Sequence, residues 1–327
     1  MDLACIFSAG IDTPDHIARA EQLGYRGAWV TDSPTFMADP WITLARAAER
    51  TSHIRLGVCA VTPRLRHVVA TAGAAATLDA VAPGRIDIVV GTGFTSQAML
   101  NKRPARWSEA EAYLRALRGL LAGEEIEWDG EIITLPYPRL SGITLPADVR
   151  IWVAAHGPKG LQVGRRLSDG IVTNPGHGSH NEVWGDTRVF VQVNGTVLDE
   201  DEPLDSPRVI AAAGPAAALH LHIGDEGAAA GTAEVRAFHA QMEKVDPRRR
   251  HIETHRGHLT EVTELERPYV TAELIGRATE TGSPAHMRAY LEGLAGSGVS
   301  GVLYFPAGPD IPRELETFAA SASAVCA

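Results

Sequence analysis

Histidines gather between residues 251 and 258, where their side chains could ligate a metal or transfer a proton. His251 and His255 have the i, i+4 spacing of one helix face, with Glu253 between them and His258 close behind. The His-Glu-x-x-His order of a helical zinc site is absent, so we predict no metal site. The group is either a solvated helix face or an active-site element whose neutral histidine donates a proton or a hydrogen bond.

Two other polar side chains directly follow predicted strands. His177 comes after the expected strand at 170–173, in a Gly-His-Gly-Ser-His stretch that is either part of the site or a flexible loop. Asp32 follows the expected strand at 28–31 and is either a site carboxylate or a turn carboxylate, since Asp-Ser-Pro is common in turns. The candidate catalytic residues are Asp32, His177, His255 and His258.

A glycine-containing loop, Ala-His-Gly-Pro-Lys at 155–159, joins a predicted strand to a predicted helix. Such a loop presents unpaired backbone N–H groups and the positive end of the helix dipole, and both favour a phosphate group. His156 and Gly157 are the expected donors, although the loop could also be a simple capping turn. Gly91-Thr92-Gly93 ends another predicted strand, but the third glycine and the spacing of a dinucleotide-binding motif are missing.

Short β-rich segments alternate with longer helical ones, as in a parallel sheet wrapped by helices. Segments such as Ile-Asp-Ile-Val-Val at 86–90 are largely apolar, as strands buried on both faces are. The expected strands are 3–9, 28–31, 54–61, 86–90, 151–154, 170–173, 189–193 and 301–305. The expected helices are 13–23, 40–50, 67–81, 109–121, 160–167 and 283–294.

This order predicts an α/β fold, and a closed (β/α)₈ barrel accounts for it most simply. A doubly wound open sheet is the alternative, because periodicity does not show whether the sheet closes. Two regions interrupt the alternation: a hairpin at 125–135 that turns at Asp129-Gly130, after strand four, and a helical stretch at 207–279 near strand seven.

The bulk properties favour a soluble enzyme. The chain has 327 residues, of which 45% are hydrophobic, and a net charge of −10, which disfavours nucleic-acid and anionic-membrane partners. The first residues lack the basic flank and apolar run of a signal peptide, and no apolar stretch is long enough to cross a bilayer. The cysteines do not have the spacing of metal ligands, and Cys5 and Cys59 are expected to be buried thiols. A cytoplasmic location is expected.

Three segments in order resemble the luciferase-like monooxygenase superfamily, which contains bacterial-luciferase-like flavin- and deazaflavin-dependent oxidoreductases. They are GYRGAWVTDSPTFMADPWITLARAAERTSHIRLGVCAVTP, HVVATAGAAATLDAVAPGRIDIVVGTG and IWVAAHGPKGLQVGRRLSDGIVTN. The closing GSPAHMRAYLEGLAGSGVSGVLYF is similar to the last helix–strand unit of the family. The resemblance implies one TIM-barrel domain over residues 1–327, with insertions after strand four and near strand seven.

The resemblance also implies which residues contact a cofactor. Residues 58–62 end strand three, where the family often has a bulge, sometimes with a non-prolyl cis peptide, behind the flavin ring. Phe94 and Ser33 stand where sugar-phosphate and alcohol dehydrogenases of the family have glutamate and histidine, which puts that chemistry in doubt. The implied cofactor residues are Asp32, Ala60, Val61, Thr62, Gly91, Gly93, Phe94, Ala155, His156 and Gly157.

The activity implied by the resemblance is hydride transfer between a small organic substrate and the deazaflavin coenzyme F420, bound without covalent attachment. One alternative is a two-component monooxygenase that uses reduced FMN and oxygen, with a separate flavin or deazaflavin reductase as its partner. Another is a non-catalytic flavin-binding barrel. A homodimer is expected, because members of the family often pair through barrel helices.

Overall fold

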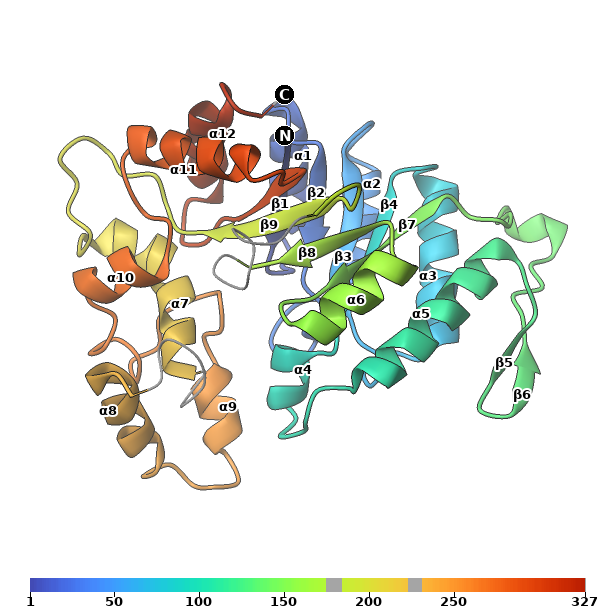
Figure 1. Ribbon diagram of the computed structural model, residues 1–327, viewed down its shortest axis with the longest axis horizontal. Helices are drawn as coiled ribbons and strands as arrows, with labels where there is room; N and C mark the ends of the chain where they lie inside the picture. Colours follow the sequence, from blue (N-terminus) through green and yellow to red (C-terminus); the bar gives the residue numbers. More distant parts are fainter. Residues whose placement is uncertain (175–183, 223–230, 327) are drawn as a thin grey trace.

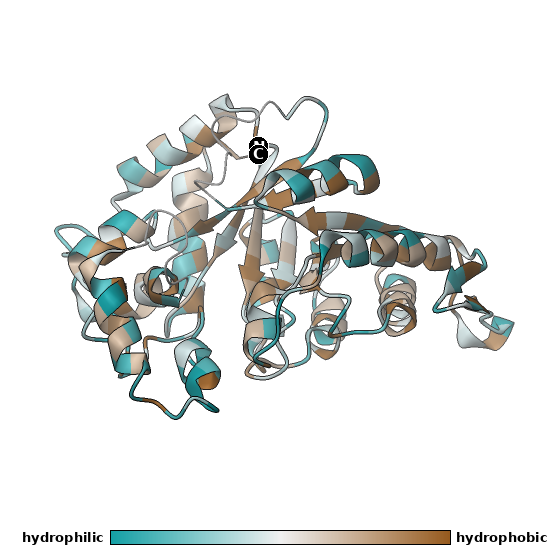
Figure 2. Ribbon diagram, turned by 60° about the horizontal axis from the view of Figure 1, so that its bottom comes forward, coloured by the Kyte–Doolittle hydropathy of each residue, from teal (hydrophilic) through white to brown (hydrophobic). Residues whose placement is uncertain are grey.

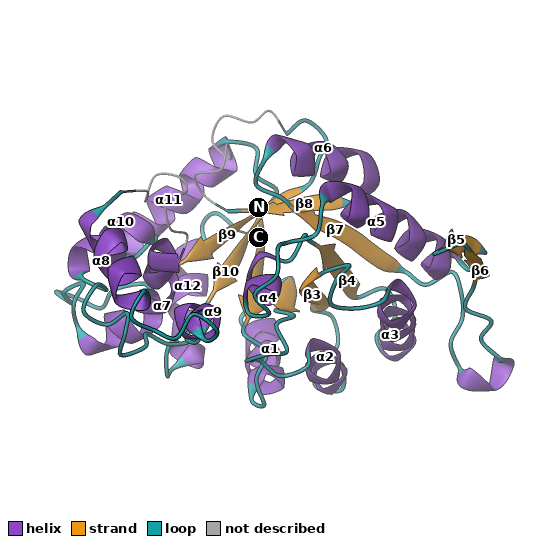
Figure 3. Cartoon of the chain, turned by 90° about the horizontal axis from the view of Figure 1, so that it is seen from below, coloured by secondary structure: helices purple, strands orange, loops and turns teal. Residues whose placement is uncertain are grey.

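Eight parallel strands close into a barrel in the computed structural model, which describes residues 1–174, 184–222 and 231–326. The first strand pairs with both the second and the last, so the sheet has no open edge and the doubly wound alternative is excluded. Figure 3 shows the strands in orange with helices around them. Its strands, in barrel order from one to eight, are β1 (Asp2–Phe7), β2 (Gly27–Val30), β3 (Arg55–Val61), β4 (Ile86–Val90), β7 (Val149–Ala154), β8 (Gly170–Thr173), β9 (Val189–Asn194) and β10 (Gly301–Phe305).

Helices cover the outside of the barrel (Figure 1). Several begin at or next to the residues that their sequence predicts: Thr13 and Pro14 form the start of the first helix, the Asp39 side chain caps the second, and Ser283 caps the helix before the last strand. The predicted helices are confirmed, with ends that differ by a few residues. The outer helices are α1 (Thr13–Gln22), α2 (Pro40–Ala48), α3 (Val68–Val81), α5 (Trp107–Ala122), α6 (Pro158–Leu167), α11 (Pro284–Gly296) and α12 (Ile311–Ala322).

A layer of aromatic rings fills the barrel interior, where the apolar colouring of Figure 2 is concentrated in the strands. Trp29, Trp152 and Phe190 contact one another with ring centroids 5.0 to 5.7 Å apart. Each ring lies beside a glycine that is its register partner on the neighbouring strand, and a Cβ at that glycine would clash with the ring. The three ring–glycine pairs are Trp29 with Gly57, Trp152 with Gly170, and Phe190 with Gly301. Large and small side chains therefore alternate around the barrel, which lets the layer fill without overpacking.

The first insertion follows β4 and contains the predicted hairpin. The short helix α4 (Phe94–Ala98) precedes α5, and β5 (Ile126–Trp128) then pairs with β6 (Glu131–Ile133). Asp129 and Gly130 both have positive φ, at 53° and 85°, as the two central residues of a type I′ turn require. A 3₁₀ turn, η1 (Arg139–Ser141), leads back toward β7.

The second insertion lies between β9 and α11, where the sequence shows only an unclear helical pattern. It contains α7 (Pro207–His222), α8 (Ala233–Met242), α9 (Arg250–His255) and α10 (Ala272–Ala278). These helices lie beside the barrel and bury a small core of their own, which includes Phe238, Met242 and Leu274 (Figure 1). Among the helices of the described ranges, none is both long and apolar enough to cross a membrane.

Buried ion pairs join the second insertion to the barrel. Arg208, at the start of α7, donates to Glu314 Oε1 of α12 at 3.0 Å and to Glu202 Oε1 at 2.8 Å. Glu314 is 2% exposed and accepts a further hydrogen bond from the Tyr304 hydroxyl of β10. The charged groups therefore satisfy one another where the insertion leaves the barrel.

Glu202→Gln should lower stability at neutral pH but much less in acid. Hydrogen bonds from Arg208, the Asp199 N–H and Ser206 lower the pKa of Glu202 to about 2. Because this pKa is below the unfolded value of about 4.3, the carboxylate stabilises the fold above that pH, and the contribution is lost as the pH falls toward 2. The urea midpoint of the variant should lie below that of the wild type at pH 7, and the gap should narrow from about pH 4.5 downward. Glu200→Gln, at an exposed position of the same loop, is the control, and its urea midpoint should equal that of the wild type. If the difference in midpoint between Glu202→Gln and wild type did not change with pH, the assigned role of the Glu202 carboxylate would be contradicted.

Candidate functional site

The predicted site residues that the structure describes lie at one end of the barrel, because parallel strands bring their carboxyl ends together. Direct contacts show how close they are: a Cβ on Gly91 would be 3.2 Å from Ala60 Cβ, and one on Gly93 would be 2.7 Å from Thr62 Cγ2. Val61 and Thr62 are fully buried, whereas Phe94, at the start of α4, is 54% exposed. His177 falls outside the described residues.

β3 ends in the bulge that the resemblance implies. The register between β3 and β4 shifts between Cys59 and Val61, and the Cys59–Ala60 peptide bond is cis. Cys59, Ala60, Ala154 at the end of β7, and Leu259 of the second insertion all pack against the buried residues of the barrel interior. The bulge therefore lies on the inner side of the barrel end, with the insertion over it.

Asp32 is an ion-paired carboxylate. Arg66, in the loop after β3, donates to Asp32 Oδ2 at 2.7 Å and to Asp32 Oδ1 at 3.2 Å, and also to Asp39 Oδ2 at 2.7 Å. Burial raises the pKa of Asp32, and the hydrogen bonds from Arg66 oppose that rise. Both carboxylate oxygens are thus occupied, which suits an anchor for the loop after β3 better than a free proton acceptor. A catalytic role for Asp32 remains a prediction.

The loop between β7 and α6 has the polarity of an anion site. Gly157 is the N-cap residue of α6, Pro158 follows it, and a Cβ on Gly157 would meet nothing within 4 Å. The first N–H groups of α6 and the positive end of its dipole lie at this open position. His156 Nδ1 accepts a hydrogen bond from the Asn174 N–H, at 3.3 Å, which holds its ring toward the end of β8.

Ala155 does not offer a free donor in this loop. Its backbone N–H is bonded to the Val172 carbonyl at 3.0 Å, and the residue is 1% exposed. Ala155 continues the sheet ladder by one residue beyond β7, so only the groups that follow it can face a ligand. Of the residues of this loop that the resemblance implies, only His156 and Gly157 are therefore left to donate a backbone N–H to a phosphate.

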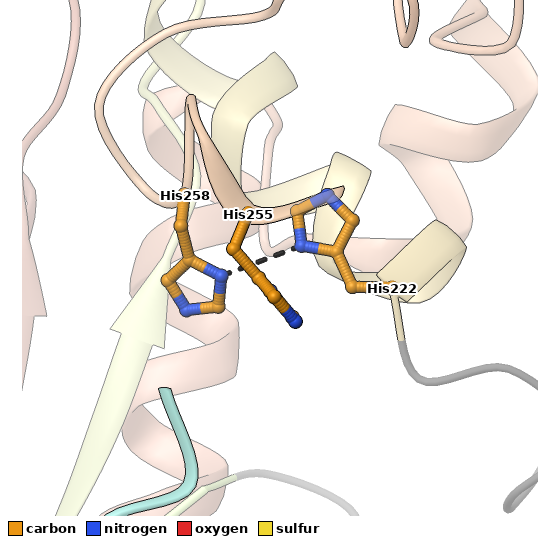
Figure 4. A group of neighbouring side chains, drawn as sticks. All are labelled: His222, His255 and His258. Atoms are coloured by element: carbon orange, nitrogen blue, oxygen red, sulfur yellow. Dashed lines mark hydrogen bonds between the residues drawn. The ribbon is translucent and has the colours of Figure 1, made fainter. Parts of the chain in front are cut away.

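His255 and His258 belong to a buried cluster with His222, the last residue of α7 (Figure 4). The three residues are 8%, 6% and 8% exposed, in the order His255, His258, His222. Burial and the neighbouring His222 lower the pKa of His255 to about 4, and the same two causes hold the pKa of His258 well below its usual value. The interpretation as a solvated helix face is therefore wrong for these two histidines, which are neutral at pH 7.

The histidine cluster is tied to the barrel end. His258 Nε2 lies 2.9 Å from Thr95 Oγ1 of α4, and Leu259, the next residue, packs against the buried residues of the barrel interior. Leu259 and Thr260 also line a pocket of about 250 Å³ with Phe7, Ser8 and other residues after β1 and β10. The second insertion thus covers part of the barrel end and leaves a small pocket beside it.

The sequence gives no signal for several residues of this site. Arg66, His222, Thr95 and Glu266 have no distinctive local motif. Each acts on a residue that lies far away in the chain, such as Arg66 on Asp32, which is 34 positions earlier. Only the folded chain brings these partners together.

Comparison with curated proteins finds relatives at about one-third identity. The chain is 34% identical over 203 residues to an F420-dependent glucose-6-phosphate dehydrogenase of Beutenbergia cavernae, covering 55% of this chain and 57% of that protein. It is 31% identical over 173 residues to a 5,10-methylenetetrahydromethanopterin reductase of Methanolobus tindarius, covering 51% and 52%. The chain therefore matches about half the length of these relatives.

Solved structures share the fold over nearly the whole chain. An F420-dependent secondary alcohol dehydrogenase in complex with an F420-acetone adduct superposes with a TM-score of 0.68 at 16% identity, with full coverage of both chains. The coenzyme F420 dependent tetrahydromethanopterin reductase from Methanopyrus kandleri has a TM-score of 0.67 at 18% identity and covers 97% of this chain and 96% of that one. At these identities the likeness shows a common fold.

A family match covers most of the sequence, including the bulged third strand and the loop between β7 and α6. It extends over residues 11–301, from the first helix to the last barrel strand. The chain belongs to the luciferase-like monooxygenase family.

Proposed function

We propose that this protein transfers a hydride between the deazaflavin coenzyme F420 and a small organic substrate. The observation that carries the proposal is the placement of an open helix N-terminus at Gly157 and a bulged β3 at one barrel end. Relatives at about one-third identity whose names include F420 dependence support the choice of coenzyme. When bound, the deazaflavin would supply the carbon that gives or accepts the hydride.

His156 and Gly157, at the start of α6, would hold the coenzyme phosphate. The open space at Gly157 is where a phosphate could approach the first turn of α6, whose N–H groups lack carbonyl partners of their own helix. Gly157 suits this position because a larger residue would occupy the space that the anion needs. The residues present therefore fit the phosphate end of a deazaflavin or of FMN.

The ring end would lie against the bulge of β3 and Gly91, which directly follows β4. Ala60 and Gly91 are small residues in contact, so a flat ring can approach the backbone there. Leu259 and the histidine cluster lie over the same end and would keep water from the reacting atoms. Because Phe94 and Ser33 replace the glutamate and histidine of the sugar-phosphate and alcohol dehydrogenases, we propose a substrate of a different class.

Gly157→Asp tests the phosphate site. Aspartate is a good N-cap residue, so the helix should keep its stability, but the new carboxylate would repel a phosphate. Gly157→Asn is the matched control, because it has the same shape without the charge. In titrations followed by tryptophan fluorescence, we expect Gly157→Asp to bind F420 at least about tenfold more weakly than Gly157→Asn.

The same titration with FMN decides between the coenzymes. Tighter binding of F420 than of FMN supports the proposal, whereas preferential FMN binding would replace it by the two-component monooxygenase. Equal affinity of Gly157→Asp and Gly157→Asn would show that the phosphate lies elsewhere. Binding without turnover of any organic substrate would favour the non-catalytic flavin-binding barrel.

A further inference from the structure

The His222–His255–His258 cluster, defined above, has the geometry of a ligand set. One ring nitrogen from each histidine lies within 4.8 Å of the others, and Nδ1 of His222 is 3.3 Å from Nδ1 of His258. The rings converge from the end of α7 and from the end of α9 and its following turn (Figure 4). In a tetrahedral zinc site with Zn–N bonds of 2.0–2.1 Å, ligand nitrogens are about 3.4 Å apart. The His222–His258 pair already has this separation.

The other ring nitrogens of these two residues are held by hydrogen bonds. His222 Nε2 lies 2.5 Å from Glu266 Oε1, and His258 Nε2 lies 2.9 Å from Thr95 Oγ1. Glu266 is 1% exposed and is itself fixed by the N–H and hydroxyl of Thr263, both at 2.8 Å. Metal-bound histidines commonly donate their second N–H to a carboxylate or another oxygen in this way, which directs the lone pair of the first nitrogen at the ion.

We propose that His222, His255 and His258 bind a divalent transition-metal ion of the zinc class. When the Nε2 hydrogens of His222 and His258 are directed at Glu266 and Thr95, their two Nδ1 lone pairs face each other at 3.3 Å, and a cation between them satisfies both. The third ring points to the same conclusion, because Nδ1 of the buried His255 has no hydrogen-bond partner. A proton shared by His222 and His258 would satisfy only two of the three rings.

The proposed site differs from the spacing seen in the sequence. His251, which pairs with His255 at i, i+4, is not in the group, and His222 from a different helix takes its place. No fourth histidine, cysteine or carboxylate joins the group among residues 1–174, 184–222 and 231–326. Three protein ligands with one position left for water or a substrate oxygen is the arrangement of catalytic zinc sites.

The ion would also join two helices of the second insertion, because His222 ends α7 and His255 ends α9. His258 connects the site to the barrel end through its hydrogen bond with Thr95 of α4. This binding requires no coenzyme. A failed metal experiment would therefore leave the F420 proposal standing, and a failed coenzyme titration would leave the metal proposal standing.

Cobalt titration of the chelator-treated protein, without coenzyme, tests the site directly. Tetrahedral Co²⁺ gives intense visible absorption, so wild type should show this band and saturate at about one ion per chain. The band should be lost in His222→Ala and His258→Ala. His239→Ala is the control, because His239 lies nearby, bonded to the Leu221 carbonyl through Nε2, but outside the cluster. Unchanged binding in both cluster variants, or no saturable band in wild type, would overturn the proposal.

Glu266→Gln tests the same site without removing a ligand. The amide is nearly isosteric but a weaker acceptor for His222 Nε2–H, so Co²⁺ and Zn²⁺ affinity should fall by about 10–100-fold. Saturating Zn²⁺ should raise the Tm of wild type and of His239→Ala, but not of His222→Ala. This readout shows whether each variant is folded as well as whether it binds. Equal Zn²⁺ affinity for Glu266→Gln and wild type would contradict the assigned role of His222.

Discussion

Replacing Arg66 with methionine should destabilise the protein by about 3–5 kcal/mol, because it leaves the buried carboxylate of Asp32 without its partner. The Asp32 side chain is fully buried, and the Arg66 side chain is only 22% exposed. Methionine keeps most of the aliphatic stem, so the loss reports on the charge rather than on packing. Urea unfolding at pH 7 measures the effect.

Arg64→Met is the matched control in the same loop. Arg64 pairs with Glu109, and their side chains are 37% and 38% exposed, so its loss should cost no more than about 1 kcal/mol. The deficit of Arg66→Met should shrink as the pH falls, since an unpaired buried Asp32 has a folded pKa above the unfolded one and regains stability by protonation. Adding Asp32→Asn should restore much of the loss. If Arg66→Met costs no more than Arg64→Met, then Asp32 is not held as an anchor and is free for the catalytic role predicted from the sequence.

Much of the barrel could be predicted from the sequence because its strands and helices have local signatures. Strand Ile86–Val90 and strand Gly170–Thr173 match their predicted ranges, and the Asp129-Gly130 turn was readable because type I′ geometry requires such residues. Closure was not readable from periodicity, since it depends on β1 pairing with β10 across the whole chain. The resemblance to the family supplied that information.

The candidate site was predictable only where one loop contains the whole signal. The loop at 155–159 is such a case: it was predicted to lead into a helix at 160, and α6 begins within it at Pro158, because capping residues are local. The histidines show the opposite: spacing groups His251 with His255, but the fold pairs His258 with His222, 36 positions earlier. The ion pair of Asp32 with Arg66 could not be predicted for the same reason. Side chains that come together only through tertiary packing produce no periodic pattern in the sequence.

Gly170→Ala should destabilise the barrel by about 1–3 kcal/mol, although it adds only one methyl group. The new Cβ would clash with the indole of Trp152, its register partner on β7, and would lie 3.0 Å from the Arg188 carbonyl oxygen. Trp152 is 1% exposed and contacts Trp29 and Phe190, so its ring has no room to move. Chemical unfolding of the purified variant measures the loss.

Gly27→Ala is the control for adding a methyl group to a strand glycine of the same barrel. Its Cβ would have its nearest contact at 3.5 Å, to Ala4 Cβ, which is ordinary packing, so this variant should be neutral or more stable by up to about 1 kcal/mol. Trp152→Phe removes the ring atoms that the Gly170→Ala methyl would meet. The cost of Gly170→Ala should therefore be smaller in the Trp152→Phe background, and the double-mutant cycle should give a coupling of about 0.5 kcal/mol or more. An equal cost in both backgrounds would mean that Gly170→Ala acts through the backbone of the strand and not through contact with the indole. Coupling would mean that Gly170 and the ring of Trp152 pack together as one unit of the barrel.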